Sequence, residues 1–569
     1  MDNKFIANIL REIGEILEIQ GENRFKILSY NRAADILENY PYDLEEIVER
    51  DPKLLLEIPG IGDSIAEKIE ELVLRGEIKF HQQLLKKFNH KLLELLNIRG
   101  IGPKKVRLFS VQLGIEDIEQ LEAAAKSGAL ATLPKMGKKS ESEILEAINE
   151  YKQHKLRYLL PYGLQTAEKY IAYLSKSPDI KKVEYAGSLR RRKETVGDID
   201  ILTTGKNKNK IMDYLCSFPG VTKVLAKGST KSSVLDETGI QIDLRIVESD
   251  EYGSALQYFT GCKDHNVAMR EIAKKRGYKI SEYGVFKKEK KVAGKTEEEV
   301  YKIMGYPYIE PELRENRGEF EAARAGKLPK LIEYKDLKGD LHMHSVWSDG
   351  SQSIIEIVKQ AKKLGFKYIA ISDHSQSLRV AKGLDENSIL VQIEEIQRLR
   401  EKEKDILILT GAEVDILENG DLDFSNKILS KLDIVIGSVH SKFRLPRDEQ
   451  TKRVIKALNN PYLKILGHPS GRLLLKREPL QLDMEAIIKE AAKNKKILEI
   501  NSNPQRLDLN DYYIKMAKDM NVKFAINSDS HHTDQFAYLK FGIFQARRGW
   551  LEKTDVINTS NDILKAFKT

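Results

Sequence analysis

The sequence predicts a multidomain protein of the α plus α/β class: a helical region, then mixed helices and strands, then a β/α barrel. Apolar residues recur at intervals of three and four up to about residue 155. The period changes to two after about residue 156, and strand-like and helix-like segments alternate from residue 339 onward. A chain of 569 residues is long enough for several domains, each with its own core.

The composition is that of a globular protein and excludes several classes. Apolar residues make up 41% of the chain and charged residues 32%. No apolar run approaches the ~20 residues of a membrane helix, and the first residues lack the pattern of a signal peptide. Two cysteines, Cys216 and Cys262, argue against a disulfide scaffold and predict a cytoplasmic protein. The net charge of +8 permits nucleic-acid binding without establishing it.

A glycine turn before a helix is repeated in the helical region. Two clear copies occupy residues 59–62 and 100–103, and a weaker copy occupies 133–138. Such a turn leaves backbone N–H groups free, and the helix dipole helps them to hold a phosphate. One copy alone is better explained as a capped connection between helices, but the repetition favours binding of the DNA backbone. The turns resemble helix–hairpin–helix motifs, which assign DNA contact to Gly60, Gly62, Gly100 and Gly102.

Two aspartates stand two residues apart in Gly197-Asp198-Ile199-Asp200, on a predicted strand. Residues at this spacing share a face, and Asp243 lies on another predicted strand. Such a pair alone usually marks a solvated strand face. Three carboxylates on neighbouring strands can instead bind two Mg²⁺ ions, one activating an attacking hydroxyl and one stabilising a leaving pyrophosphate.

A basic turn, Gly187-Ser188-Leu189-Arg190-Arg191-Arg192, precedes the aspartate pair. It offers N–H groups, a hydroxyl and guanidinium groups to a triphosphate, whereas the alternative is an exposed basic turn. Together with the segment YFTG at 258–261, these motifs resemble family X DNA polymerases over residues 1–318. The resemblance implies a nucleotidyltransferase-fold palm that binds Mg²⁺ or Mn²⁺, a thumb, primed or gapped DNA and deoxynucleoside triphosphates as substrates.

The resemblance also assigns individual roles. Asp198, Asp200 and Asp243 would be the catalytic metal ligands. Contact with the nucleotide is assigned to Ser188, Arg191, Gly197, Tyr258, Phe259 and Asn266, and contact with the template to Arg270. Two departures stand out: Val196 replaces a serine of some members, and Gln241 replaces an arginine, which weakens the expected positioning of the primer end.

The segment FKILSYNRAAD, followed by IPGIGDSIAEKIEE, resembles the small lyase domain of the same family. There a lysine forms a Schiff base with a 5′-deoxyribose phosphate. The matching residue is Lys68, with Lys26 and Tyr30 as contacts of the phosphate or sugar. Ser64 replaces a lysine present in some members, so a solvated helix lysine at position 68 is an equally good interpretation.

Seven apolar runs in the last third of the chain each end in a polar residue that can bind metal, and seven of the eleven histidines fall there. In a β/α barrel this strand edge is where chemistry collects. The runs are GDLHMH, YIAISDH, LTGAEVD, IVIGSVH, KILGHP, ILEIN and FAINSDSH. A single such histidine would more often be a hydrogen-bonded core residue, but the set predicts a multinuclear metal centre.

The first run extends to GDLHMHSVWSDG and resembles the PHP domain (polymerase and histidinol phosphatase), a distorted barrel of seven βα units. The resemblance implies up to three Mn²⁺ or Zn²⁺ ions and hydrolysis of phosphodiesters. His532 is not expected to be a ligand, and His265 is expected to be DNA-facing or structural. The implied ligands are His342, His344, Asp349, His374, Glu413, His440, His468, Asp529 and His531.

These inferences combine into one hypothesis: a monomeric DNA polymerase that fills short gaps in base excision repair, fused to a 3′–5′ exonuclease that also processes abasic sites. The alternatives are a DNA-binding scaffold, a PHP phosphoesterase with weak or no polymerase activity, and a transferase acting on RNA or small molecules. The expected domains are a lyase-like domain at 1–85, a fingers-like domain at 86–155, the palm at 156–245, the thumb at 246–318, a linker at 319–338 and the PHP domain at 339–569.

Overall fold

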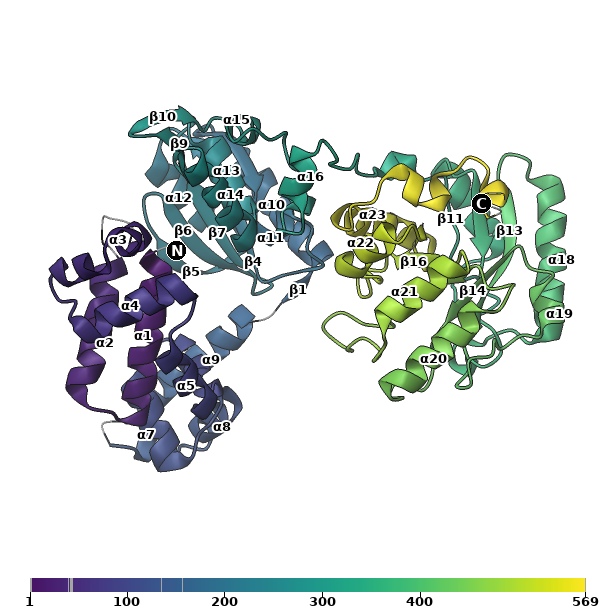
Figure 1. The fold of residues 1–569 in the computed structure, drawn as a ribbon. Helices are drawn as coiled ribbons and strands as arrows, with labels where there is room; N and C mark the ends of the chain where they lie inside the picture. Colours follow the sequence, from purple (N-terminus) through teal and green to yellow (C-terminus); the bar gives the residue numbers. More distant parts are fainter. Residues whose placement is uncertain (1–2, 39, 41–43, 135, 156, 568–569) are drawn as a thin grey trace. The chain divides into compact units, whose positions relative to one another are not determined.

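The structure, a computed structural model, describes residues 3–38, 40, 44–134, 136–155 and 157–567. They form two compact units that meet in the sequence between residues 156 and 157 (Figure 1). Among the described residues, helices with the length and apolar character to cross a membrane are absent.

The first unit is helical and contains two apolar cores. Helix α1 contributes to both, because Ile13 packs into the first core and Ile16, one turn further on, into the second. Helices α4 and α7 end at Gly76 and Gly114, which adopt the left-handed conformation that favours glycine. The helices are α1 (Asn3–Gln20), α2 (Arg24–Glu38), α3 (Leu44–Arg50), α4 (Asp63–Arg75), α5 (Lys79–Lys87), α6 (Lys91–Glu94), α7 (Pro103–Leu113), α8 (Ile118–Lys126) and α9 (Lys138–Lys155).

The second unit begins with a five-stranded sheet in the order β2-β4-β7-β6-β5, in which β4 and β7 are the parallel pair. Ile199 and Ile201 of β4 are buried against the helices, as their alternation with the aspartates predicts. The elements are β1 (Tyr158–Leu159), α10 (Leu160–Leu174), β2 (Ile180–Tyr185), α11 (Gly187–Arg190), β3 (Thr195–Val196), β4 (Asp198–Gly205), α12 (Lys208–Cys216), β5 (Val221–Lys227), β6 (Lys231–Asp236) and β7 (Gln241–Ile246).

Helices and a small antiparallel sheet follow. The segment 319–338, expected as a linker, is instead packed: Phe320 and Leu331 are buried in the core of this region, because its apolar side chains find a surface to cover. The elements are α13 (Tyr252–Thr260), α14 (Lys263–Lys275), β8 (Lys279–Ser281), β9 (Gly284–Lys287), β10 (Lys290–Ala293), α15 (Glu297–Ile303) and α16 (Glu319–Arg324).

The last region is the predicted barrel of seven parallel strands, which pair in chain order. The strands are β11 (Gly339–Asp340), β12 (Tyr368–Ile371), β13 (Leu407–Asp415), β14 (Ile434–Ser438), β15 (Ile465–Leu466), β16 (Ile497–Asn501) and β17 (Lys523–Asn527). The helices are α17 (Ile354–Lys363), α18 (Glu386–Lys402), α19 (Asn426–Leu429), α20 (Arg447–Leu458), α21 (Met484–Lys493), α22 (Asp511–Asp519), α23 (Leu539–Arg548) and α24 (Ile563–Ala566).

The barrel strands are buried on both faces, as parallel strands covered by helices usually are. In β12, Tyr368 and Ala370 belong to one apolar cluster and Ile369 and Ile371 to another. The first and last strand segments meet just beyond their ends, where the amide of His344 donates to the carbonyl of Ser530 at 2.8 Å. The sheet is therefore nearly closed, and its strand ends converge on one opening.

Candidate functional site

The structure brings together all nine residues predicted to bind metal in the barrel, which lie at the carboxyl ends of its strands or in the segments that follow them. Eight of them form three overlapping groups whose ligand atoms lie within 4.8 Å of one another. The ninth, His468, places Nε2 at 2.9 Å from Oε1 of Glu413. The groups are His344, Asp349, His374 and His531; His342, His344, Glu413 and Asp529; and His374, Glu413 and His440.

Glu413 lies at the centre of the cluster. Its Oε2 is 3.0 Å from Nδ1 of His374 and 3.3 Å from Nε2 of His342. Its Oε1 is 3.4 Å from Nε2 of His440 and 2.9 Å from Nε2 of His468. A carboxylate with different imidazoles around each oxygen is suited to bridge two cations.

Several buried ring nitrogens in the cluster make no hydrogen bond of good geometry, even where a carboxylate oxygen of Glu413 lies within 3.3 Å. They are Nε2 of His342, Nδ1 of His344, Nδ1 of His374 and Nδ1 of His468. Buried polar atoms are almost always hydrogen-bonded, so four orphaned imidazole nitrogens beside carboxylates call for another partner. A borderline cation such as Mn²⁺ or Zn²⁺ accepts this mixture of nitrogen and oxygen donors, and the residues therefore fit a metal centre.

The electrostatics of the cluster agree with this fit. Burial lowers the pKa of His440, but the carboxylates of Glu413 and Asp415 outweigh burial and raise it to about 9. Burial and the neighbouring His374 lower the pKa of His344 to about 4. Without a metal, His440 therefore holds a second proton more readily than His344, although both rings lie in the same cluster. Divalent cations would replace these protons, since a metal binds the neutral imidazole and the ionised carboxylate.

Two carboxylates that orient the ligands were not among the predicted ligands. Oε1 of Glu499 is 2.7 Å from Nδ1 of His342, and Oδ1 of Asp415 is 2.7 Å from Nδ1 of His440. A carboxylate on one ring nitrogen fixes the ring so that the other nitrogen faces the cluster. Glu499 lies within the run ILEIN and Asp415 ends the run LTGAEVD, so the signal was present in the sequence, but it did not separate ligands from orienting residues.

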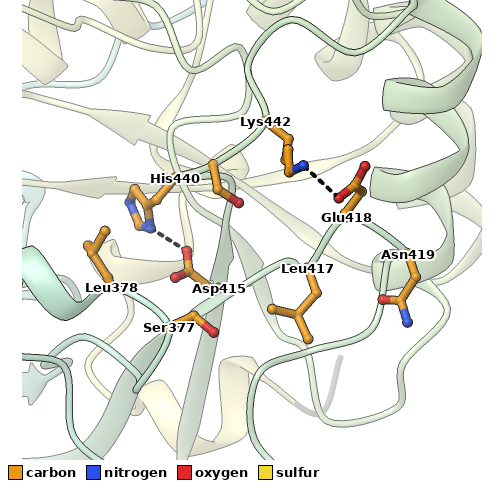
Figure 2. Close-up of a pocket in the computed structure, with 9 residues that line it drawn as sticks. Ser377, Leu378, Asp415, Leu417, Glu418, Asn419, His440 and Lys442 are labelled. Carbon is orange, nitrogen blue, oxygen red and sulfur yellow. Dashed lines mark hydrogen bonds and ion pairs between the residues drawn. The ribbon is translucent and has the colours of Figure 1, made fainter.

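A cavity of about 570 Å³ adjoins the cluster. His440 and Asp415 lie on one side of it, and Figure 2 shows Lys442 paired with Glu418 on the other. Leu378 and Leu417 supply an apolar part of the wall. The cavity thus joins metal-ligand candidates, an apolar surface and a lysine.

The three predicted palm aspartates also lie together. Strands β4 and β7 run parallel with Asp200 directly opposite Asp243, and Asp198 lies two residues before Asp200 on the same face. Burial raises the pKa of Asp200 to about 7, and the charges of Asp198 and Asp243 add to this effect. Carboxylates that repel one another in a partly buried place fit a divalent cation, which would remove the repulsion.

Asp243 has cationic and amide partners that the sequence did not reveal. Nζ of Lys231 lies 2.7 Å from Oδ2, and Nε2 of Gln241 donates to Oδ1 at 2.9 Å. Burial raises the pKa of Asp243, but these hydrogen bonds outweigh burial and lower it. Gln241 therefore orients the carboxylate, and Lys231 brings a positive charge to the site.

Gly187 brings the basic turn close to the aspartates. Its φ is +62°, and a Cβ atom at this position would lie 2.7 Å from Oδ2 of Asp200. Arg191 is not directed freely into solvent: Nε donates to Glu315 at 3.0 Å and Nη1 to the carbonyl of Thr260 at 2.7 Å. Ser188 follows Gly187 at the start of the turn and precedes Arg191 by three residues.

The other arginines of the turn are also engaged. Arg190 binds Glu297 through both terminal nitrogens, at 2.9 and 2.7 Å. The guanidinium of Arg192 lies over the ring of Tyr185, 5.3 Å from its centroid. The charge of Arg190 is therefore used in a buried ion pair, whereas Arg191 is the arginine of this turn that was assigned to the nucleotide.

In the predicted thumb, Tyr258 and Phe259 are half-buried, with their rings edge to face at a centroid distance of 5.1 Å. Asn266 holds the segment that carries them, because its Nδ2 donates to the carbonyl of Tyr258 at 2.7 Å. Its Oδ1 accepts from Gln257 at 2.9 Å. Arg270 lies one turn further along the same helix, α14.

The repeated glycine turns of the first unit share one conformation. Gly60 and Gly100 have φ of +94° and +80°, while Gly62 and Gly102 directly precede helices α4 and α7. The amides of Ile61 and Ile101 each donate to a carbonyl three residues back at 3.0 Å, and Met136 of the weaker copy makes the same bond. Part of that copy, Lys135, lies outside the described residues.

Lys68 is held on its own helix. Its Nζ donates to the carbonyl and hydroxyl oxygens of Ser64 at 2.9 and 3.0 Å. It also lies 6.0 Å from the ring centroid of Tyr30 and 5.9 Å from that of Phe80, and Nζ of Lys26 lies 4.8 Å from the latter. The structure therefore gathers the predicted lyase residues on one aromatic surface.

Two further histidines lie apart from the metal cluster. His265 is fully buried between Oε1 of Glu319 at 2.7 Å and the hydroxyl of Tyr301 at 3.0 Å, so it is structural. His532 lies outside the metal cluster, with its ring 3.3 Å from Asp534.

Models of known families match four parts of the chain. The helix-hairpin-helix domain matches residues 1–78, and the SAM-like helix-hairpin-helix tandem matches 92–150. The DNA polymerase beta thumb matches residues 255–315, and the PHP domain matches 340–503. These matches agree with the predicted fold class in the helical region, in the thumb and in most of the barrel.

Individual proteins match larger stretches. The "DNA polymerase/3′-5′ exonuclease PolX" of Bacillus subtilis is 37% identical over 565 residues, covering 98% of this chain and 97% of that protein. DNA polymerase lambda of Rattus norvegicus is 26% identical over 349 residues, 55% of this chain and 56% of that protein. A probable phosphatase of Thermoanaerobacter is 31% identical over 239 residues, 40% of this chain and 93% of that protein. Since the first likeness spans nearly the whole of both proteins, the chain belongs to the bacterial PolX type of family X DNA polymerases with a C-terminal PHP domain.

Proposed function

We propose that this protein is a DNA polymerase that fills short gaps in base excision repair and trims DNA 3′ ends with its barrel. One observation carries the proposal: Asp198, Asp200 and Asp243 meet on two adjacent parallel strands in a chain that matches PolX over 98% of its length.

In the polymerase reaction Asp198 and Asp200 would hold two Mg²⁺ or Mn²⁺ ions, and Asp243 would hold the one nearer the primer 3′-OH. Bound there, these ions make the hydroxyl easier to deprotonate and stabilise the leaving pyrophosphate. Gly197 keeps the backbone before Asp198 free of a side chain. Oδ1 of Asp243 is held by Gln241, which keeps this carboxylate oriented while the primer end approaches.

The basic turn and the thumb supply the nucleotide contacts of the proposal. Ser188 and Arg191 bind the triphosphate, and the two bonds that Arg191 already makes use Nε and Nη1 but not Nη2. Tyr258 and Phe259 bind the sugar and base, in a segment that Asn266 fixes. In this proposal Asn266 also meets the base edge, and Arg270 contacts the template.

The barrel would hydrolyse the terminal phosphodiester. The nine clustered residues would hold up to three Mn²⁺ or Zn²⁺ ions, which supply an activated water at neutral pH. The cavity beside His440 is large enough to admit one nucleotide, with Leu378 and Leu417 against the base. The same chemistry accounts for 3′–5′ trimming and for cleavage at abasic sites.

The helix–hairpin–helix turns would bind the DNA backbone through Gly60, Gly62, Gly100 and Gly102. A second activity, 5′-deoxyribose phosphate lyase, is favoured by one observation: Lys68 lies beside Tyr30 and Phe80, with Lys26 at the same rings. Trapping with borohydride on a 5′-deoxyribose phosphate end tests it, because the wild type forms a covalent adduct that Lys68→Ala abolishes.

The substrates of this proposal are gapped or primed DNA and deoxynucleoside triphosphates. Each site is built from one chain, which supports a monomer, and both cysteines are free thiols, which supports a cytoplasmic location. We retain the six-part domain division, except that residues 319–338 pack on the thumb core rather than forming a free linker.

Extension of a primer across a one-nucleotide gap tests the polymerase, and Mn²⁺-dependent shortening of a labelled 3′ end tests the barrel. Asp198→Ala should abolish extension and keep shortening, whereas His342→Ala should do the reverse. Equal extension by wild type and Asp198→Ala would refute the polymerase. Shortening without any extension by the wild type would leave the phosphoesterase alternative, and DNA binding without either activity would leave the scaffold.

A further inference from the structure

The turn that leads from Arg190 to Glu194 is held by the barrel. The two carboxylate oxygens of Glu194 accept hydrogen bonds from the two terminal nitrogens of Arg472, at 3.1 and 2.7 Å. The side chain of Arg472 is 7% exposed and that of Glu194 28%. A bidentate arginine–carboxylate pair fixes both the distance between the two side chains and their relative orientation.

A second arginine of the barrel forms a hydrogen bond with the start of the same turn. Arg548, at the end of α23 and 1% exposed, donates from Nη1 to the carbonyl of Arg191 at 2.6 Å and to Glu315 at 3.1 Å. Glu315 also accepts from the Arg191 side chain at 3.0 Å. Glu315 is thus shared between the nucleotide-binding turn and the barrel, while Asp511 receives the other end of Arg548.

Apolar contacts surround these polar ones. Leu507 and Phe541 of the barrel are buried in the core cluster of the five-stranded sheet. The guanidinium of Arg192 lies over Phe544 of α23, 4.5 Å from the ring centroid. The hydrogen bonds of Arg472 and Arg548 therefore lie in a packed surface in which both arginines are buried and Glu194 is partly exposed. Charge pairs in such a surface hold geometry more firmly than fully exposed pairs do.

We propose that Arg548 and Arg472 of the barrel are positioning residues for nucleotide incorporation: they hold the turn between Ser188 and Asp198 in the shape that binds the triphosphate. This inference rests on the proposed polymerase function. The turn carries the proposed phosphate contacts at one end and the first metal ligand at the other, so a small displacement of it misplaces both. The PHP domain would then serve synthesis as well as trimming.

The neighbouring residue offers a matched control. Arg547 precedes Arg548 on α23 and also reaches across to the thumb segment, where it donates to Glu312 at 2.8 Å and to the carbonyl of Ile332 at 3.3 Å. These contacts, and its ion pair with Glu310, do not involve the turn. Arg547→Gln and Glu312→Gln therefore weaken the same surface, while Arg548→Gln and Glu194→Gln act on the turn itself.

The test measures KM for the nucleotide and kcat on a one-nucleotide gap, together with gapped-DNA affinity and 3′ trimming. Arg548→Gln should raise KM about tenfold and Glu194→Gln about fivefold, because each loses a charge-assisted hydrogen bond at the turn. DNA affinity and trimming should stay within about twofold for both. Arg547→Gln and Glu312→Gln should change KM by less than about twofold.

A further pair of variants separates a specific contact from general damage. Glu194→Gln should raise KM much less in an Arg472→Gln background than in the wild type, because the two side chains act through one ion pair. A reversal of the two charges is unsuitable, since Arg472 also donates to the carbonyls of Arg506 and Leu507. If Arg548→Gln does not fold, the KM of Glu194→Gln decides the question, because Glu194 is partly exposed and its replacement disturbs the core less. If the wild type is active and Glu194→Gln and Glu312→Gln have the same KM as the wild type, the inference is wrong and the proposed polymerase function stands. If the wild type incorporates no nucleotide, the proposed function itself is wrong.

Discussion

At the scale of single residues, the two candidate sites share one feature. Their carboxylates are buried or lie close to one another, and both conditions disfavour the charged form unless a cation or a positive group is near. Burial and the adjacent aspartates raise the pKa of Asp200 to about 7. In the barrel, Glu413 is 1% exposed yet ionised, because the imidazoles around it, His440 and His342 foremost, outweigh burial and hold its pKa well below the ordinary value. Such groups are stabilised when a cation binds, so each site is poised for metal.

Gly187→Ala should lower incorporation efficiency about a hundredfold, because a methyl group there would lie 2.7 Å from Oδ2 of Asp200 and displace the carboxylate. Gly326→Ala is the control, since Gly326 has φ of +65°, close to the +62° of Gly187, but no atom within 4 Å of its Cβ position. Both variants carry the backbone strain of alanine, about 1–2 kcal/mol, so the difference between them isolates the clash. Similar gap-filling rates for the two would contradict this account.

The ion pairs of Glu297 predict a pH dependence of stability. Burial raises its pKa, but Arg314 and Arg190 outweigh burial and lower it to about 2 from 4.5. A depressed carboxyl pKa stabilises the fold above the unfolded value, and this stabilisation is lost as the pH falls from about 4.5 to about 2. Glu297→Gln should therefore cost about 3 kcal/mol at pH 7 and progressively less over that window. Urea unfolding at several pH values measures it, with the exposed Glu298→Gln as control; a constant difference would exclude the ion-pair explanation.

At the scale of elements, strand ends explain what the sequence could predict. Parallel strands bring their carboxyl ends to one edge, so the histidines and carboxylates at these ends predicted a metal centre. The resemblance to the PHP domain then gave the nine ligands. The roles of Glu499 and Asp415 could not, because orientation of a ring depends on which nitrogen faces which neighbour. Partners such as Arg191 and Glu315 lie 124 residues apart, and no local pattern connects them.

The glycine turns predict a salt-dependent grip on DNA. Lys104 is the second residue of α7, two residues after Gly102; its side chain is 88% exposed, and its Nζ lies 4.0 Å from Oε1 of Glu18. Lys104→Gln should weaken binding equally for different DNA sequences and reduce the slope of log affinity against log salt by about 1. Lys126→Gln on α8, also exposed, should leave the slope unchanged. Anisotropy titrations at several salt concentrations measure both, and an unchanged slope for Lys104→Gln would remove the phosphate contact from the model of binding.

At the scale of the whole molecule, the chain is divided into a helical unit and a larger unit that contains both candidate metal sites. Among the described residues, clusters able to hold a metal lie in the larger unit. Ligands stabilise the unit that binds them by mass action. Metal removal should therefore act on one part of the molecule and leave the other unchanged.

The tryptophans make this division measurable. Both tryptophans of the chain, Trp347 and Trp550, lie in the larger unit, so their fluorescence reports its unfolding, whereas far-ultraviolet circular dichroism reports helices of both units. Mn²⁺ at a hundred times its dissociation constant should stabilise the larger unit by about 2.7 kcal/mol relative to protein treated with EDTA. The fluorescence transition should move to higher temperature, and the part of the dichroism transition due to the helical unit should stay in place. His342→Ala should reduce the shift, because it removes a ligand that Glu499 holds in position. A fluorescence transition that does not respond to Mn²⁺ in the wild type would mean that the clustered histidines and carboxylates do not form a metal site.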